Sequence, residues 1–263
     1  MFDQGFADGA GNEQCSDTSA SAAEDAPMRS ERLPFAVRIV RNEADLWKAV
    51  QIRHAAYARH VPGLAQSLTM PEPSDMEQGV VVLLAESKVD GSPLGTMRIQ
   101  TNLHQRLPLE QSVDLPSWMG GMRMAEATRL GVTEMRIGRV VKTVLFKAFY
   151  QYCERNQIEW MVVAGRAPID RQYERLMFDE VFPGQGYVPL LHAANMPHRV
   201  MSFNVDTAQA RWRAAQHPLF NFVFRTAHDD IDVGPRNGVA RRAIGNKVQF
   251  FSSVPTRVAV KNM

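Results

Sequence analysis

One stretch of the sequence combines basic side chains with the predicted start of a helix. Apolar residues recur at helical spacing over residues 137–152, which predicts a long amphipathic helix that begins near Thr133. Its first turns carry Arg136, Gly138 and Arg139, and a glycine inside a helix costs about 1 kcal/mol relative to alanine. Free N–H groups, two arginines and a missing side chain favour a receptor for a phosphate or an extended amide-rich ligand. The alternative is an ordinary helix whose arginines are solvated.

The sequence lacks the patterns that would indicate a different chemistry. It has no Walker A run and no GxGxxG after a strand, which argues against nucleotide hydrolysis and dinucleotide binding. Its histidines show no HExxH or other metal-ligand spacing, and no GxSxG supports serine hydrolysis. Cys15 and Cys153 give no disulfide framework, and Cys153 lies beside the apolar stripe, where core packing is expected. We therefore expect no metal and no nucleophilic cysteine.

The charge of the chain is unevenly distributed along its length. The 263 residues carry a formal net charge of only +2, which does not indicate a nucleic-acid partner. Up to Met28 every charged residue is acidic, and after Asp232 every one is basic. We expect a disordered acidic leader over 1–33, one domain over 34–232 and a basic tail over 233–263. The tail is either a flexible solubilising segment or a contact for an acidic partner or a peripheral membrane surface.

The chain has no signal-peptide pattern and no apolar run long enough to cross a membrane, so we expect a soluble, cytoplasmic protein. Hydrophobic periodicity predicts strands and helices in mixed order. The predicted strands are 35–41, 79–86, 95–101, 124–132, 158–165, 187–191 and 199–206. The predicted helices start at Asn42 or Asp45 and near Thr133, and cover 169–180, with an added helix within 212–228. This order predicts an α+β domain whose mostly antiparallel sheet contains one parallel connection.

Several charged side chains occupy unusual places on these elements. Arg53 lies on the otherwise apolar face of the first helix, so it needs a partner or a cleft. Glu72 and Asp75 lie in a proline-rich loop or short irregular helix over 61–79. In the strand GTMRIQT, Arg98 points away from the Met97 face because the side-chain period is two.

The predicted elements, with the helix-start site directly after the fourth strand, resemble the GNAT acyltransferase fold. In that fold the donor thioester lies at this junction, and a mixed, mostly antiparallel sheet is flanked by helices. A set of charged residues resembles, more narrowly, the signature of the acyl-homoserine-lactone synthases. That signature has an arginine and an aromatic on the first helix, two acids three residues apart, an arginine in a strand and a Glu-x-x-Arg strand motif. The matching residues are Arg53, Tyr57, Glu72, Asp75, Arg98, Glu126 and Arg129.

Other segments, LFKAFYQYC and GRAPIDRQYERLMF, look closer to the long-chain N-acyl amino acid synthases of the same superfamily. The chain departs from the lactone synthases at Glu72, where Asp is usual, and at Tyr57, where Phe is usual. It also adds the long head and tail. The resemblance covers residues 35–230 and implies transfer of a long fatty acyl chain from a thioester to the α-amine of an amino acid.

This reaction assigns an expected role to each matching residue. The amine must lose a proton and the carbonyl must be polarised before attack. We expect Glu126 to deprotonate the amine through a water or to hold the ammonium, with Glu72 and Asp75 as second candidates. Tyr57 closes the pocket, and three arginines suit the acceptor carboxylate. These arginines are Arg53, Arg98 and Arg129. The alternative is a buried ion-pair network without a catalytic step.

Glu126 and Arg129 would face opposite sides of a regular strand. If they act together, a β-bulge must lie between them.

The resemblance also implies a donor and a partner. The helix start, with Val132, Thr133, Arg136, Gly138 and Arg139, would bind the phosphopantetheine of an acyl carrier protein, and no permanently bound cofactor is expected. Helical spacing places Arg136, Arg139, Thr143 and Lys147 on the face opposite the apolar stripe, where they either dock an acidic carrier or are merely solvated. The alternatives are a coenzyme A donor, a lactone-forming enzyme and a non-catalytic module that binds an acyl carrier.

Overall fold

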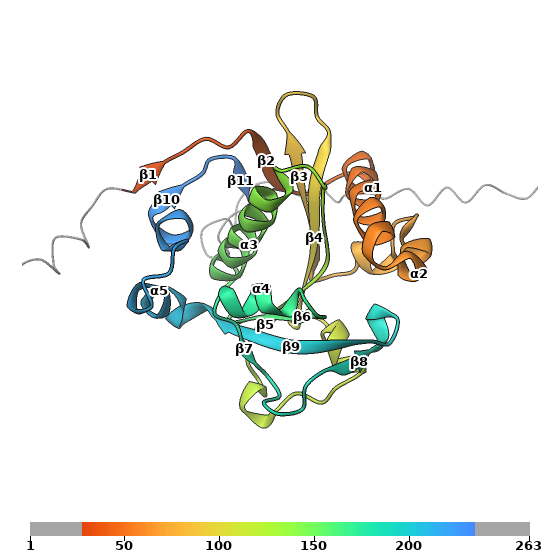
Figure 1. The fold of residues 1–263 in the computed structure, drawn as a ribbon, viewed down its shortest axis with the longest axis vertical. Helices are drawn as coiled ribbons and strands as arrows, with labels where there is room; N and C mark the ends of the chain where they lie inside the picture. Colours follow the sequence, from red (N-terminus) through yellow and green to blue (C-terminus); the bar gives the residue numbers. More distant parts are fainter. Residues whose placement is uncertain (1–27, 235–263) are drawn as a thin grey trace, which may run out of the picture.

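The computed structural model describes residues 28–234, which fold around a nine-stranded sheet (Figure 1). Its strands follow one another in the order β11, β2, β3, β4, β5, β6, β9 and β7, and β8 pairs with β9. Their bounds are β2 Phe35–Ile39, β3 Val80–Ser87, β4 Pro93–Thr101, β5 Met124–Val132, β6 Trp160–Gly165, β7 Asp179–Glu180, β8 Val188–Leu190, β9 Met196–Asn204 and β11 Ile231–Asp232. The β5–β6 and β11–β2 pairs are parallel and the others are antiparallel. The predicted α+β class and mixed, mostly antiparallel sheet are confirmed.

Helices cover both faces of this sheet. The bounds of the α-helices are α1 Glu43–His60, α2 Pro62–Ala65, α3 Gly138–Arg155, α4 Asp170–Arg175 and α5 Val205–Ala214. Leu83 of β3 packs in the core cluster that contains α3, whereas Leu84 packs with residues of α1. Because helices lie on both faces, β3 is a continuous apolar run rather than an alternating one.

The same alternation sets the direction of the polar residues of β4. Met97 and Ile99 lie in the core cluster with α3. Arg98 is also buried, but its guanidinium contacts Ser74 and Thr128 on the opposite face. The predicted direction of Arg98 is confirmed, and it places this cation on the α1 side of the sheet.

The long helix begins later than the sequence indicated. The first residue of α3 is Gly138, and Thr133 does not cap it. The peptide N–H of Thr133 donates to the Leu94 carbonyl (2.9 Å), which extends the pairing of β5 with β4. Residues 134–137 then form a turn before the helix starts. Gly138 is therefore the first helical residue and not an interior one.

Three other predicted boundaries were wrong. The helix predicted over 169–180 ends at Arg175, because Met177 adopts a left-handed φ of 64° that turns the chain into β7. The last sheet strand ends at Asn204, whose side chain caps α5 by accepting from the Thr207 N–H (2.9 Å). That helix covers Val205–Ala214, and the added helix predicted within 212–228 is limited to a short π-helix, Asn221–Arg225, followed by β10, Thr226–Ala227.

The two ends of the described chain lie together. Strand β1 (Arg29–Ser30) pairs with β10, in parallel, and β11 pairs with β2. Leu33 and Val233 are both buried, so the ordered structure extends beyond the predicted domain of 34–232 on each side. Most of the predicted leader and tail lies in 1–27 and 235–263, outside the described residues. Among the helices of residues 28–234, none has the length and apolar content needed to cross a bilayer.

Candidate active site

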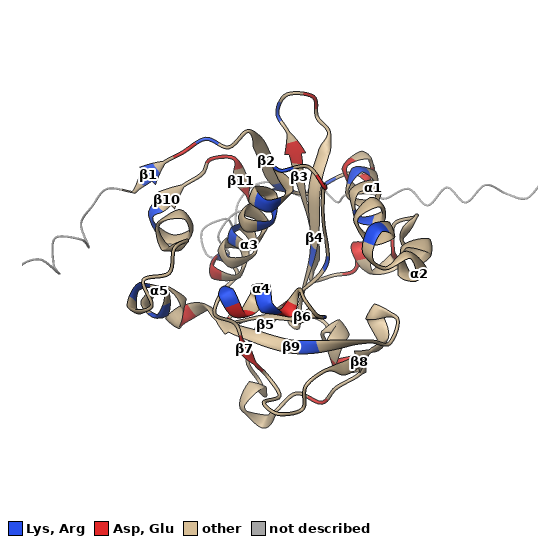
Figure 2. Cartoon of the chain, in the orientation of Figure 1, with Lys and Arg blue, Asp and Glu red and all other residues tan. Residues whose placement is uncertain are grey.

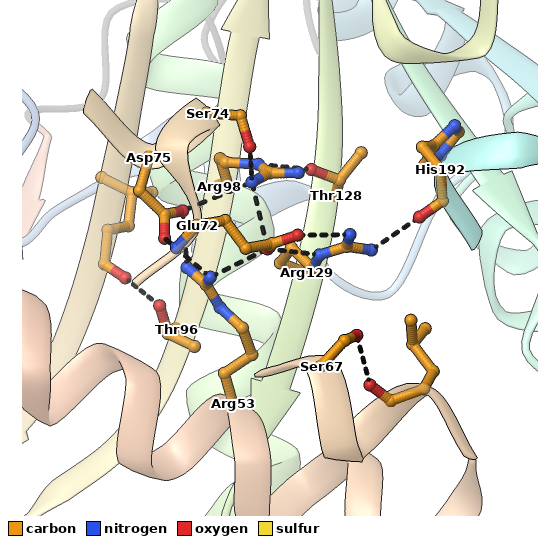
Figure 3. Close-up of polar contacts among 12 residues, drawn as sticks. Arg53, Ser67, Glu72, Ser74, Asp75, Thr96, Arg98, Thr128, Arg129 and His192 are labelled. Carbon is orange, nitrogen blue, oxygen red and sulfur yellow. Dashed lines mark hydrogen bonds and ion pairs between the residues drawn. The ribbon is translucent and has the colours of Figure 1, made fainter. Parts of the chain in front are cut away.

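Three arginines and two acids from four separate segments converge on the α1 side of the sheet (Figure 3). Arg53 of α1 binds Asp75 with two hydrogen bonds of 2.9 Å each. Arg129 of β5 binds Glu72 with two hydrogen bonds of 2.7 Å each. Arg98 of β4 contacts Glu72 at 3.2 Å and donates to Ser74 Oγ at 2.6 Å. We call this set the ion-pair cluster; its members are Arg53, Glu72, Asp75, Arg98 and Arg129.

The loop between α1 and β3 presents both acids because of their three-residue spacing. Pro73–Met76 forms a short 3-10 turn, and the Asp75 carboxylate accepts from the Glu72 N–H at 2.9 Å. This hydrogen bond fixes the two carboxylates beside each other. The expectation of a short irregular helix in this region is confirmed, since η2 (Gln66–Leu68) and the turn at Pro73–Met76 both lie within it.

A β-bulge brings Arg129 to the same face as Glu126. Arg98 pairs with Thr128 while Thr96 pairs with Gly131, so β5 contains one extra residue over this interval. Arg129 adopts a φ of 55° within it. Left-handed backbone conformation is typical of such bulges, which change the direction of a side chain. The predicted condition for Glu126 and Arg129 to lie on one face is therefore met.

Close packing of α1 on β5 positions Arg53. A Cβ atom on Gly131 would lie 3.2 Å from the Arg53 Cα and 3.0 Å from the Ala56 Cβ, so a side chain there would push the helix away. The Arg53 side chain is fully buried. It pairs with both acids, which fits the expectation that these arginines can hold the acids in place, and its burial leaves contact with the acceptor carboxylate a prediction.

The ion-pair cluster has a net positive charge. Burial alone would raise the pKa of Glu72, but hydrogen bonding and charge from Arg129, with charge from Arg98 and Arg53, hold its pKa below the usual range. Glu72 is thus ionised at neutral pH, and three guanidinium groups face two carboxylates. The Glu72 side chain is 19% exposed and the Arg129 side chain 8%, so a ligand would approach the cluster from this side. Such a site suits a ligand carboxylate.

Tyr57 lies next to the ion-pair cluster, one turn after Arg53 on α1. Burial raises the pKa of its hydroxyl, while the charges of Arg129, Arg53 and Arg98 oppose that shift. The hydroxyl therefore stays protonated at neutral pH.

Glu126 lies apart from the ion-pair cluster and is completely buried. Its Oε2 accepts from the Leu109 N–H at 3.0 Å, and its Oε1 lies 3.4 Å from His192 Nε2. Burial raises the pKa of Glu126 to about 8, against the opposing effect of the Leu109 N–H. We did not predict the contact with His192, because no local pattern connects a loop histidine to a strand so distant in sequence.

A second site lies where β5 ends and α3 begins. A pocket of about 380 Å³ is lined there by all five predicted donor-binding residues and by three neighbours. The lining residues are Val132, Thr133, Glu134, Met135, Arg136, Gly138, Arg139 and Lys142. A Cβ on Gly138 would lie 2.1 Å from the Thr133 carbonyl oxygen, so only glycine permits this tight turn. The arrangement presents basic side chains beside the first turn of a helix, which suits an anionic ligand.

The predicted docking face on α3 needs one correction. Arg136 and Arg139 are exposed, and Thr143 is partly buried. Figure 2 shows basic positions along α3. Lys147, however, is fully buried, and its ammonium donates to the carbonyl oxygens of Phe222 and Thr226. It binds the C-terminal segment instead of facing a partner, so the basic face is shorter than the helical spacing indicated.

The strands β5 and β6 separate beside these sites. Their pairing runs from Met124 opposite Trp160 to Ala127 opposite Val163 and then stops. Backbone groups of β5 after Ala127 thus have no ladder partner on β6. Within residues 28–234, no group of three or more His, Cys, Asp or Glu side chains is placed to hold a metal ion.

No protein-family model and no curated protein sequence matches the chain. Solved structures do match its fold. FeeM, an N-acyl amino acid synthase from uncultured soil microbes, aligns with a TM-score of 0.54 and 19% identity over 69% of this chain and 96% of FeeM. BjaI, a CoA-dependent acyl-homoserine lactone synthase, aligns with a TM-score of 0.50 and 16% identity over 77% of this chain and 95% of BjaI. The chain therefore has the GNAT fold, as the resemblance in its sequence implied.

Proposed function

We propose that this chain is an N-acyltransferase that moves a long fatty acyl group from a phosphopantetheine thioester to the α-amine of an amino acid. One observation carries the proposal. The strand β5 bears Glu126 and Arg129, the latter a member of the ion-pair cluster, and ends at Val132 in the pocket at the start of α3. Arg129 and Val132 are three residues apart, which is roughly 10 Å along a strand. A donor in the pocket and an acceptor at the ion-pair cluster would therefore meet along this strand.

The acceptor would bind through its charged ends. Its carboxylate would be attracted by the surplus positive charge of the ion-pair cluster, where Arg98 and Arg129 are less deeply buried than Arg53. Glu72 and Asp75 orient these arginines, and Arg53 fixes the acids. Tyr57 forms part of the wall.

The donor would extend from the pocket into the gap between β5 and β6. Unpaired backbone groups of β5 can hydrogen-bond the amides of a pantetheine arm, as an added strand would. The acceptor nitrogen then attacks the thioester carbonyl, and the tetrahedral intermediate expels the thiolate. Glu126, acting through a water, is the base for the ammonium proton.

We propose an acyl carrier protein as the carrier of the donor. Arg136 and Arg139 are exposed on the rim of the pocket and would meet an acidic carrier surface. A coenzyme A donor is the second candidate, because BjaI is described as CoA-dependent. A lactone product and a non-catalytic carrier-binding module are the remaining alternatives, and the same experiment separates them.

The test is mass spectrometry of lipid extracts from cells that express wild type, Glu126→Gln or Glu77→Gln. Glu77 is an exposed acid near the loop that carries Glu72 and serves as the matched control. We expect a new N-acyl amino acid with wild type and Glu77→Gln and a loss of roughly 100-fold or more with Glu126→Gln. A lactone would identify the lactone-forming alternative. No new lipid, with folded protein and supplied acyl carrier protein or acyl-CoA, would favour the non-catalytic module.

A further inference from the structure

A histidine side chain lies beside the buried carboxyl of Glu126 and can exchange a proton with it. His192 lies in η6 (Leu191–Ala193), and its Nε2 is 3.4 Å from Glu126 Oε1. Oε1 makes no hydrogen bond of ordinary geometry to any described residue. Separations of this length are common in sites without ligand and shorten when the substrate binds. A proton between these two atoms would satisfy an oxygen that otherwise has no partner.

The histidine is held in this place by contacts to its backbone. Arg129 donates to the His192 carbonyl oxygen at 3.0 Å, and Ser112 Oγ accepts from the Leu191 N–H at 2.8 Å. The turn that follows has two left-handed residues, Ala194 and Asn195, which direct the chain into β9. Since Arg129 also binds Glu72, the position of the imidazole is tied to the ion-pair cluster (Figure 3).

Charged and titratable groups face this pair from every element packed against it. Those that act on Glu126 are Arg98 of β4, Arg129 of β5 and Glu110 of η4 (Pro108–Gln111), together with the Leu109 N–H. Those that act on His192 are Arg129, Arg98 and His198 of β9, together with the Pro108 carbonyl.

Burial is the largest influence on both members of the pair. It raises the pKa of Glu126 to about 8 and lowers the pKa of His192 to about 4. Between about pH 4 and about pH 8 the Glu126 carboxyl is therefore protonated and the His192 ring is neutral.

We propose that His192 is a positioning residue for Glu126: the two side chains share one proton, and the imidazole changes tautomer as Glu126 changes from acid to carboxylate. Nε2 accepts from the protonated carboxyl, and Nε2–H donates to the carboxylate. A neutral imidazole can do both without moving. His192 thereby stabilises each state that a general base must adopt. This role deepens the proposed function and depends on it for its catalytic meaning.

The proton balance of the reaction fits such a pair. An ammonium acceptor and a thioester give an amide, a thiol and one proton. The N–H bond of the ammonium breaks, its electron pair stays on nitrogen, and the proton passes to the Glu126 carboxylate. The second N–H proton leaves with the thiolate. The proton then returns to solvent; Glu126 is completely buried, and in the His192 side chain, which is 11% exposed, Nδ1 is buried as well.

The first test is nitrogen NMR of histidine-labelled protein across pH, with the His192 signal assigned by its loss in His192→Gln. We expect the His192 ring to stay neutral well below the usual histidine pKa and to change tautomer as Glu126 ionises, near pH 8. In Glu126→Gln the tautomer should not change with pH. A His192 ring that titrates at the ordinary value, or a tautomer that ignores Glu126, would overturn the proposal. This measurement needs no turnover, so it can fail or succeed independently of the proposed function.

The second test compares the pH dependence of acyl transfer in two variants. His192→Gln keeps a donor and an acceptor in place of the imidazole, whereas His192→Leu keeps neither. We expect His192→Leu to raise the midpoint of the pH–rate profile by about one pH unit or more, which lowers the rate at neutral pH roughly tenfold. His192→Gln should restore most of the lost rate. His104→Gln, at an exposed histidine, is the control. Equal profiles for His192→Leu and wild type would contradict the role of His192.

Discussion

At the scale of single residues, burial decides how much each charge pair of this protein contributes to the stability of the fold. Arg53 and Asp75 are paired with both side chains fully buried. Arg211 and Asp179 form a comparable contact of 2.9 Å, but the Asp179 side chain is 62% exposed. A buried cation that loses its partner keeps an uncompensated desolvation penalty, whereas an exposed cation that loses its partner is hydrated by water.

Asp75→Asn should therefore lower the free energy of unfolding by about 3–5 kcal/mol, because Arg53 keeps its charge in a buried place. Asp179→Asn should lower it by less than about 1 kcal/mol. Denaturant unfolding of both variants measures the difference. Similar small losses would mean that Arg53 finds full compensation in Glu72, which it contacts at 3.1 Å.

The raised pKa of Glu126 predicts how stability depends on pH. Its folded-state pKa of about 8 lies above the ordinary value of 4.5, so the folded chain holds an extra proton between the two. The stability that Glu126 contributes is fully present below about pH 4.5 and is lost as pH rises towards about 8. Over that window wild type should lose up to roughly 4 kcal/mol relative to Glu126→Gln, at about 1.4 kcal/mol per unit of pKa.

Urea unfolding of wild type and Glu126→Gln near pH 5 and near pH 8 tests this. The pKa of His192 is lowered in the folded protein, so the stability that His192 contributes decreases as pH falls below the ordinary histidine pKa. This pH dependence is opposite to that of Glu126. The titration of His192 is present in both proteins and largely cancels in the comparison. A pH-independent difference between them would show that Glu126 is ionised in the folded protein.

At the scale of elements, the start of α3 is set by one backbone contact. The Thr133 carbonyl occupies the space that a side chain at position 138 would need. A Cβ atom on Gly138 would lie 2.1 Å from the Thr133 carbonyl oxygen. The donor pocket depends on this turn, since Thr133 and Gly138 both line it.

Gly138→Ala should lower the free energy of unfolding by roughly 1–3 kcal/mol, because either Thr133 or the helix start must move. Gly63→Ala is the matched control: Gly63 lies in α2, and a Cβ there meets no atom within 4 Å. The control should be neutral or gain about 0.4–1 kcal/mol. Hydrogen exchange should accelerate over residues 134–142 in Gly138→Ala alone. Unchanged exchange there would mean that α3 begins independently of Thr133.

At the scale of the whole molecule, a buried lysine helps to join both ends of the described residues to the core. Lys147 of α3 donates to the carbonyl oxygens of Phe222 and Thr226 and contacts His228 Nδ1 at 2.8 Å. Strand β10 in turn pairs with β1. Burial lowers the pKa of Lys147 to about 8, while three acceptors around Nζ satisfy the ammonium. The segment after α5 is thus held by polar contacts as well as by its aromatic packing.

Lys147→Met should preserve the volume but leave these acceptors without a donor, at a cost of about 1–3 kcal/mol for each one left unsatisfied. Hydrogen exchange of residues 226–233 should become faster, with little change at β3 and β4. Lys48→Met removes a partly exposed lysine paired with Glu86 and is the control. Equal exchange in both variants would show that packing alone holds the C-terminal segment.

The sequence by itself determined the features that depend on local periodicity. The apolar run of β3, the stripe of α3 and the alternation in β4 each report which faces are buried, so the mixed sheet, its two helical layers and the direction of Arg98 were predictable. The resemblance of the charged residues also selected five that the fold brings together in the ion-pair cluster.

Only the tertiary structure decided features that depend on contacts between distant segments. The burial of Lys147 requires the segment around Thr226, the partner of Glu126 is a loop histidine, and the direction of Arg129 follows from a bulge in β5. The helix start at Gly138 likewise depends on how the chain leaves β5. Side-chain periodicity gives the face of an isolated element, whereas its neighbours, and the small changes in backbone conformation that redirect a side chain, are set by the packing of the whole chain.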